Sequence, residues 1–179
     1  MSIFTNPASS SAEQAQAYTS AILGLLGARP ALDVLEGTPE ALRRAINGLS
    51  ERQLSAPEAP GKWSIRHVLR HLADSEIVWS YRLRMVLAHD RPQLTGYDQD
   101  AWADRLGYAD SDAPEALDSF AVLRRANLVL LRRASLEDMK RVGVHTERGE
   151  ESVEHMVRLY AGHDLLHLRQ IERIRGAIG

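Results

Sequence analysis

Hydrophobic residues recur every three or four positions along most of this chain, which is the spacing of one face of an α-helix. Period-two alternation, the pattern of a half-buried β-strand, is nearly missing. The pattern predicts helices over residues 12–26, 38–49, 64–89, 114–133 and 151–175. We count four principal helices, with the first one broken into two around residues 30–37. This favours an all-α protein whose single domain is a four-helix bundle.

Capping residues and breakers set the expected helix ends. Thr38 followed by Pro39 is typical of a helix start, with the proline in the first turn. Ser64 is predicted to open the longest helix, and Trp63 to pack just before this cap. Residues 143–149 are expected to form a loop between two glycines, and residues 1–11 to be flexible.

Composition limits the class of protein. A chain of 179 residues with 44% hydrophobic content is large enough for one well-filled core and too short to require two domains. Its 22 basic and 24 acidic side chains give a net charge of −2 without a basic run, so nucleic acid is not an expected partner. No apolar run approaches the length of a membrane span, and we expect a soluble, cytoplasmic protein with no membrane partner.

The chain contains no cysteine. This excludes disulfides, thiolate metal ligands and a cysteine nucleophile within the chain itself. Any sulfur chemistry must therefore arrive with a substrate.

Two histidines occupy core positions of the last predicted helix. Its inward seam is spaced alternately by four and three residues and consists of Met156, Tyr160, His163, His167, Gln170 and Ile174. The i, i+4 spacing puts two imidazoles on one face, where they could share one divalent ion. A third ligand must come from another helix, and His71 is the best candidate because it shares a seam with Val68, Ser75 and Val78.

A metal ion is the simplest partner that accepts several buried, neutral imidazoles at once. Three such ligands would leave one position open for water or substrate, as in a catalytic centre, and both zinc and nickel suit them. The alternative is that each histidine is an ordinary core residue bonded to a carbonyl or carboxylate. Asp74, one turn from His71, is the candidate catalytic residue, because it could orient an imidazole or accept a proton. Its alternative role is a surface carboxylate that pairs with Arg70.

The other titratable residues near these seams are weaker candidates. His67 could be a fourth ligand, one turn before His71. Asp164 and Glu76 point to other faces of their helices than the histidines beside them. His145 could reach the mouth of a pocket or be a plain turn residue. The remaining histidines, His89 and His155, are expected in solvated helix positions.

Four segments in order carry a resemblance to a known family: PGKWSIRHVLRHLADSE over residues 60–76, GYDQDAWADRLGY over 96–108, HTERG over 145–149 and AGHDLLHLRQI over 161–171. Together they resemble the DinB/YfiT superfamily from about residue 35 to residue 175. The resemblance implies a four-helix bundle that holds a divalent metal with three histidines, at positions His71, His163 and His167 here. It also implies a possible homodimer. Some relatives have a further histidine where this chain has Leu166, a departure that removes no ligand.

The resemblance favours a metal-dependent transferase that presents a low-molecular-weight thiol to an electrophilic small molecule, and the absence of cysteine is compatible with it. The alternative enzyme is a hydrolase that uses metal-bound hydroxide, with Asp74 or Glu76 taking the proton. A third possibility is a metal-binding, stress-response module without turnover, and the last is a purely structural bundle.

The polar connection over residues 91–112 is too long for an ordinary helix connection. Its residues Tyr97, Asp98, Asp100 and Trp102 could cover the pocket with an aromatic wall and acidic groups. Alternatively, this segment is a structural cap over one end of the bundle.

Overall fold

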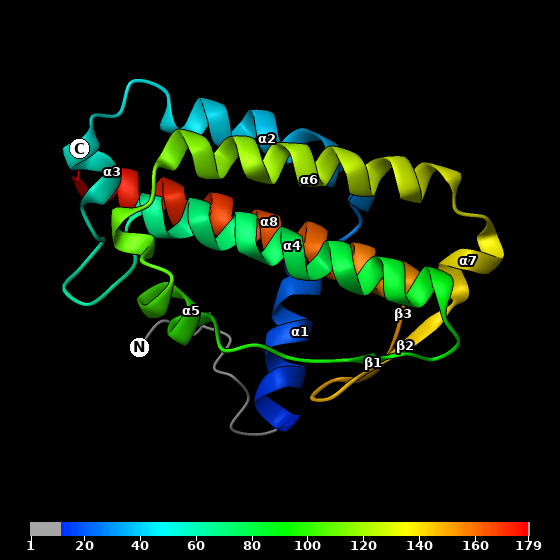
Figure 1. The fold of residues 1–179 in the computed structure, drawn as a ribbon. Helices are drawn as coiled ribbons and strands as arrows, with labels where there is room; N and C mark the ends of the chain where they lie inside the picture. Colours follow the sequence, from blue (N-terminus) through cyan, green and yellow to red (C-terminus); the bar gives the residue numbers. More distant parts are fainter. Residues whose placement is uncertain (1–11, 179) are drawn as a thin grey trace.

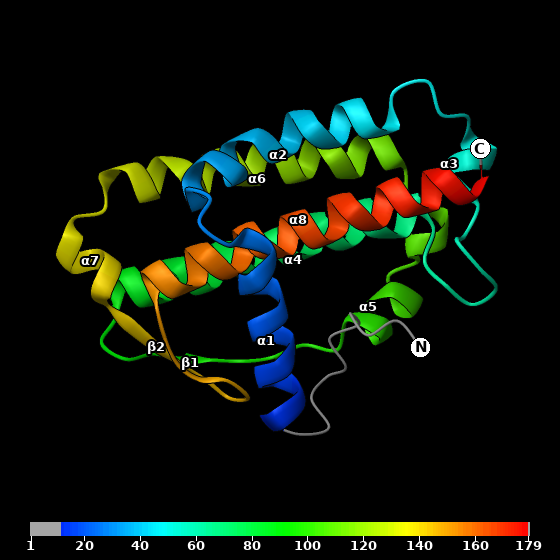
Figure 2. The same cartoon turned by 180° about the vertical axis from the view of Figure 1, so that it is seen from behind.

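The protein is a four-helix bundle in the computed structural model, which describes residues 12–178 (Figure 1). The four long helices are α2 (Ala31–Ile46), α4 (Ile65–Ala88), α6 (Ala113–Arg133) and α8 (Val153–Ile178). Helices α2 and α6 lie side by side in one layer, and α4 and α8 form the other (Figures 1 and 2). The predicted all-α bundle is confirmed. Within residues 12–178, no helix is long and apolar enough to cross a membrane.

The first helix, α1 (Ala12–Leu26), lies outside the bundle and crosses α8 (Figure 2). The two helices approach closely at Gly162, where an added Cβ would collide with the carbonyl oxygen of Ile22. Residues 27–30 connect α1 and α2, and Gly27 in this connection has a φ of +58°. The predicted break at residues 30–37 is therefore wrong. The expectation for residues 1–11 lies outside the described residues.

The predicted helix start at Thr38 and Pro39 is also wrong, because α2 begins at Ala31 and continues through Pro39. Proline lacks an N–H and therefore leaves the carbonyl of Leu35, four residues earlier, without its helical partner. That carbonyl instead accepts a hydrogen bond of 3.0 Å from Arg124 Nη1. A side chain from α6 thus satisfies the group that the proline leaves free.

The predicted start of α4 is confirmed, since the Ser64 side chain accepts a hydrogen bond from the backbone N–H of His67. The prediction that α4 is the longest helix is wrong, because α8 has 26 residues and α4 has 24. The structure adds four short helical elements that the pattern did not predict: α3 (Glu51–Ser55), α5 (Gln99–Arg105), the 3-10 helix η1 (Tyr108–Asp110) and α7 (Leu136–Lys140).

A small sheet replaces the loop predicted over residues 143–149. Strands β2 (Val142–His145) and β3 (Gly149–Ser152) pair antiparallel, and β1 (Gln93–Leu94) pairs parallel with β2. The helix α8 consequently begins at Val153 and not at Glu151. Such short strands leave too few positions for alternation to be visible in the sequence.

The core consists of two apolar clusters with a polar layer between them. The members of one cluster include the buried apolar residues within 65–73 of α4, 113–120 of α6 and 171–174 of α8. The other cluster includes the buried apolar residues within 79–86, 128–131 and 153–161 of the same helices. Between these stretches lie the buried polar side chains Thr38, Asp74, Ser75, Glu76, Arg124, Asn127, Asp164 and His167. The candidate site described below lies at this layer.

Candidate metal centre

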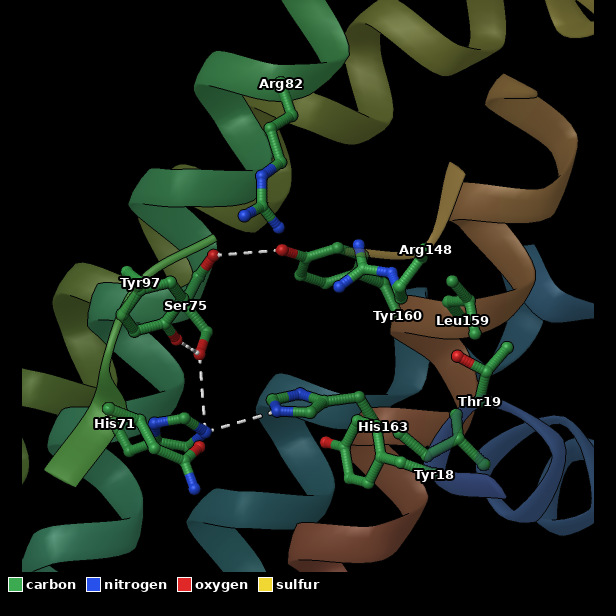
Figure 3. A pocket seen from close by; sticks show the side chains of 12 residues that line it. Tyr18, Thr19, His71, Ser75, Arg82, Tyr97, Arg148, Leu159, Tyr160 and His163 are labelled. Atoms are coloured by element: carbon green, nitrogen blue, oxygen red, sulfur yellow. Dashed lines mark hydrogen bonds between the residues drawn. The ribbon is translucent and has the colours of Figure 1, made fainter. Parts of the chain in front are cut away.

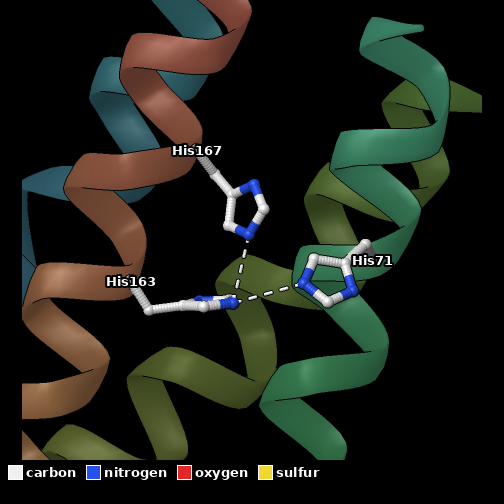
Figure 4. A group of neighbouring side chains, drawn as sticks. All are labelled: His71, His163 and His167. Carbon is white, nitrogen blue, oxygen red and sulfur yellow. Dashed lines mark hydrogen bonds between the residues drawn. The ribbon is translucent and has the colours of Figure 1, made fainter. Parts of the chain in front are cut away.

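Three imidazoles from two helices meet at the polar layer (Figure 4). His71 comes from the second turn of α4, and His163 and His167 come from consecutive turns of α8. The Nε2 atom of His163 lies 3.2 Å from Nε2 of His71 and 3.1 Å from Nε2 of His167. The three histidines predicted from the sequence thus lie together, and each turns its Nε2 atom toward the others.

These separations fit a shared metal ion. Imidazole nitrogens bind zinc at about 2.0–2.1 Å, so two ligands of a tetrahedral site stand about 3.3 Å apart. All three candidate ligand atoms lie within 4.8 Å of one another, and among residues 12–178 this is the group that could hold an ion. No carboxylate belongs to it, so the donor set is three neutral nitrogens, which suits zinc or nickel.

Burial keeps the three rings neutral, as metal ligation requires. Burial lowers the pKa of His71 well below its usual value, and the neighbouring His167 lowers it further. For His163, burial has the same effect on the pKa, with added contributions from His167 and His71. The pKa of His167 falls to about 4 through burial, although its hydrogen bond to Gln170 opposes the shift.

Gln170 fixes the tautomer of His167. Its Oε1 lies 2.8 Å from His167 Nδ1, and because an amide oxygen only accepts, Nδ1 carries the proton. The lone pair of His167 is then on Nε2, the atom that faces the other two rings. Nδ1 of His71 is buried and has no hydrogen-bond partner in the described part of the chain. Trp63 packs on the His71 ring, with 5.0 Å between centroids.

A cavity of about 70 Å³ adjoins His71 and His163 (Figure 3). It is lined by residues of α1, α4 and α8, of the segment after β1 with the start of α5, and of the turn between β2 and β3. The remaining lining residues are Tyr18, Thr19, Ile22, Ser75, Arg82, Tyr97, Gln99, Arg148, Leu159 and Tyr160. None of these is an aspartate or a glutamate, so the cavity has basic and phenolic groups beside the imidazoles and no acid.

Ser75 and Tyr97 form a hydrogen-bonded pair next to the imidazoles. Their oxygens are 2.8 Å apart, and Ser75 Oγ lies 3.4 Å from Nε2 of His71 (Figure 3). Burial raises the pKa of Tyr97, so the phenol stays protonated and can donate. Tyr97 also packs on Trp102, with 4.5 Å between ring centroids. In contrast, Asp98 caps α5 by accepting from the N–H groups of Asp100 and Ala101.

Asp74 is buried and is held by two other residues. Its Oδ2 accepts a hydrogen bond of 2.7 Å from the hydroxyl of Tyr108, and its Oδ1 lies 3.3 Å from Arg70. The pairing with Arg70, weighed as its alternative role, is present, but the carboxylate is only 2% exposed and not at the surface. No histidine is among the hydrogen-bond partners that the described chain gives this carboxylate.

The other histidines do not join the group. His67 Nδ1 lies 2.8 Å from Ser64 Oγ. His145 is buried in β2 and its Nδ1 accepts from the N–H of Glu147, while Arg148 of the same hairpin lines the cavity. His89 is exposed as predicted, and His155 is half-buried.

A second polar cluster, on the side of α4 and α8 that faces α2 and α6, was not predicted. Arg124 is 1% exposed and donates to both Glu76 oxygens, at 3.1 and 2.9 Å, and to both Asp164 oxygens, at 2.5 and 3.1 Å. Burial alone would lower the pKa of Arg124, but the two carboxylates raise it. Glu76 and Asp164 point away from the histidines on their helices, as expected, because Arg124 lies on the opposite side of α4 and α8.

Comparison with known proteins gives the family. The family model of the DinB superfamily matches residues 35–171 of this chain. The chain belongs to the DinB superfamily. A DinB relative, "Putative metal-dependent hydrolase OB0782" from Oceanobacillus iheyensis, is 30% identical over 140 residues, which are 78% of this chain and 81% of the relative. "Putative metal-dependent hydrolase YfiT" from Bacillus subtilis is 29% identical over 152 residues, 83% of this chain and 84% of its own.

The same fold is known from a solved structure. The YfiT structure from Bacillus subtilis superimposes on this chain with a TM-score of 0.74 at 27% identity, covering 82% of this chain and 86% of YfiT. It is described as "a probable metal-dependent hydrolase with an unusual four-helix bundle topology". The DinB fold and the three-histidine cluster together support a divalent metal in this protein.

Proposed function

We propose that this DinB protein is a metal-dependent enzyme that transfers a low-molecular-weight thiol to an electrophilic small molecule. The observation that carries the proposal is the convergence of three neutral imidazoles, His71, His163 and His167, beside a cavity without acidic side chains. A divalent ion such as zinc or nickel, when bound there, supplies positive charge that lowers the pKa of a coordinated thiol or water molecule.

The lack of a carboxylate in the cavity favours a thiol over water as the nucleophile. A free thiol has a pKa of about 8.5, against about 15.7 for water, so it loses its proton with much less help from a base. Ser75 and Tyr97, adjacent to His71, supply hydroxyl groups that can orient a nucleophile or substrate by hydrogen bonding. The chain has no cysteine, so the thiol must be a co-substrate.

Hydrolysis is the second candidate, and the printed names of the relatives support it. We propose Asp74 as the proton acceptor for this reaction. It is the carboxylate closest in sequence to His71, and it is buried. Glu76 is a weaker candidate because Arg124 and Asn127 donate three hydrogen bonds to it, whereas Asp74 accepts one, from Tyr108. A cytoplasmic location and a homodimer stay predictions, and light scattering would test the latter.

Metal analysis of protein purified without a histidine tag tests the centre. We expect close to one equivalent of zinc or nickel in the wild type and a loss of most of it in His71→Ala, His163→Ala and His167→Ala. His89→Ala is the matched control, because His89 is exposed and should not affect the content. Full metal content in the three variants would refute the ligand assignment.

Thiol transfer is tested with zinc-loaded protein, monochlorobimane as the electrophile and a panel of thiols that includes glutathione and cysteine. We expect conjugation above the spontaneous rate with at least one thiol, and a return to that rate in His163→Ala. Thiol-independent cleavage of p-nitrophenyl acetate, lost in the same variant, would instead establish hydrolysis. Stoichiometric metal without either reaction would favour the non-catalytic metal-binding module.

A further inference from the structure

Arg82 is a buried cation that makes no ion pair with an acidic residue of the described chain. Its side chain lies in α4, is only 6% exposed and donates from Nη2 to the backbone carbonyl of Thr95. Among the described residues, no aspartate or glutamate oxygen forms an ion pair with it. A guanidinium has five N–H donors, and this carbonyl is the hydrogen-bond acceptor that the described chain gives it.

The other arginines at the site differ in this respect. Arg148 also lines the cavity, but it makes a two-pronged pair with Glu151, at 2.5 and 2.9 Å. Arg124, on the other side of α4, is held by two carboxylates. The charges of both are therefore compensated by carboxylates of the chain, whereas Arg82 has no such counter-charge within residues 12–178.

A buried charge without a counter-charge is unfavourable unless something outside the chain supplies one. Arg82 points into the cavity with its guanidinium toward the hydroxyl end of Tyr160, and Tyr97 lines the same cavity (Figure 3). Burial raises the pKa of both phenols, so they are neutral and can donate hydrogen bonds but do not neutralise the arginine. The cavity as a whole is thus suited to an anion.

We propose that Arg82 binds an oxyanion, a carboxylate or a phosphate, on the small-molecule substrate of this site. Arg82 follows His71 by eleven residues and Ser75 by seven, which places all three on the same stripe of α4. Their side chains line one cavity. A substrate held by its anionic group at Arg82 would extend toward the three imidazoles. This inference rests on the proposed function for the position of the reacting group, and it names the class of substrate.

Binding of matched small molecules to zinc-loaded protein tests this without turnover. Succinate and phenyl phosphate carry the two oxyanions, and succinamide is the neutral match to succinate. By titration calorimetry, we expect wild-type protein to bind at least one of the anions and to bind succinamide much more weakly. Arg82→Gln should weaken binding of that anion by about 10- to 100-fold, as expected for loss of hydrogen bonds to a charged group.

Two further variants complete the test. Arg158→Gln removes one exposed positive charge from α8 and should leave the affinity unchanged. Arg82→Lys keeps the charge but loses the two-pronged geometry, so it should bind the anion with an intermediate affinity. It also serves if Arg82→Gln does not fold. Zinc content is measured in each variant and should stay at the wild-type level.

The proposal is overturned if neither anion binds, if succinamide binds as well as succinate, or if the Arg82 variants bind the anions like the wild type. The last result would indicate that the anion is held by the zinc alone. Arg82-dependent binding together with absence of thiol transfer and of hydrolysis would refute the proposed function and leave the anion site standing. Turnover that does not depend on substrate charge or on Arg82 would refute the anion site and leave the proposed function standing.

Discussion

Arg124 of α6 donates two hydrogen bonds, of 2.5 and 3.1 Å, to Asp164 of α8, the residue that directly follows His163. The same guanidinium donates to Glu76 of α4 and to the carbonyl of Leu35 in α2. One buried side chain therefore connects all four bundle helices. Because α4 and α8 carry the three imidazoles, this connection also joins the two helices of the candidate metal centre.

We predict that Arg124→Gln lowers the free energy of unfolding by about 3–5 kcal/mol, because it leaves two buried carboxylates without their counter-charge. Urea denaturation followed by circular dichroism measures the change. Arg125→Gln, at the exposed neighbouring position, is the control and should change stability by no more than about 0.5 kcal/mol. A loss below about 1 kcal/mol in Arg124→Gln would contradict the connecting role, given the size expected for a broken buried ion pair.

The long helices and the three imidazoles could be predicted from the sequence because both depend on local periodicity. A seam of positions three and four residues apart exists in the chain before it folds, and it places His163 and His167 on one face. The start of α4 at Ser64 was predictable for the same reason, since a cap is formed by a residue and its near neighbours.

The polar partners of the site could not be predicted in this way, because they come from distant segments. The spacing from Leu117 and Phe120 places Arg124 on the buried face of α6, but nothing local shows that two carboxylates from other helices surround it. Pro39 indicated a helix start, and only the tertiary contact of the Leu35 carbonyl with Arg124 shows how a proline is accommodated inside α2. Arg82 was detectable, since extending the seam of His71 and Ser75 by two turns reaches it.

The hydrogen bond from His167 Nδ1 to Gln170 predicts an effect on metal affinity. We expect Gln170→Leu to weaken zinc binding by about 10- to 100-fold, because the ring loses the acceptor that fixes its tautomer. Competition with a fluorescent zinc chelator measures the affinity. Gln170→Glu keeps an acceptor at the same place and should retain tight binding, and Arg169→Leu controls for changes at an exposed neighbour. Equal affinity in Gln170→Leu and the wild type would show that this bond does not orient the ligand.

The buried His145 predicts a loss of stability in mild acid. Burial, with smaller contributions from Arg148 and Arg82, lowers the pKa of His145 to about 3. The unfolded chain, with a histidine pKa of about 6.5, takes up the proton first, so His145 costs stability as the pH falls from about 6.5 toward 3. Above pH 6.5 the ring is neutral in both states and has no such effect.

Between pH 7 and pH 5, we expect the free energy of unfolding to fall by about 2 kcal/mol less in His145→Asn than in the wild type. Asparagine can still accept the hydrogen bond that Glu147 donates to the His145 ring. Urea denaturation at the two pH values gives the difference, and His89→Asn is the exposed control. Identical losses in His145→Asn and the wild type would mean that His145 already takes up its proton in the folded state.

A catalytic part for Asp74 competes with an anchoring one, because the carboxylate accepts a hydrogen bond from Tyr108 of η1. If Asp74 accepts a proton during turnover, Asp74→Asn should lower kcat by about 100-fold or more while the zinc content is kept. Tyr108→Phe is the matched variant, since it removes the same hydrogen bond and leaves the carboxylate in place. We expect it to lower the melting temperature about as much as Asp74→Asn but to keep most of the turnover. Equal, small losses of kcat in both variants would show that Asp74 holds η1 on α4 and takes no part in the reaction.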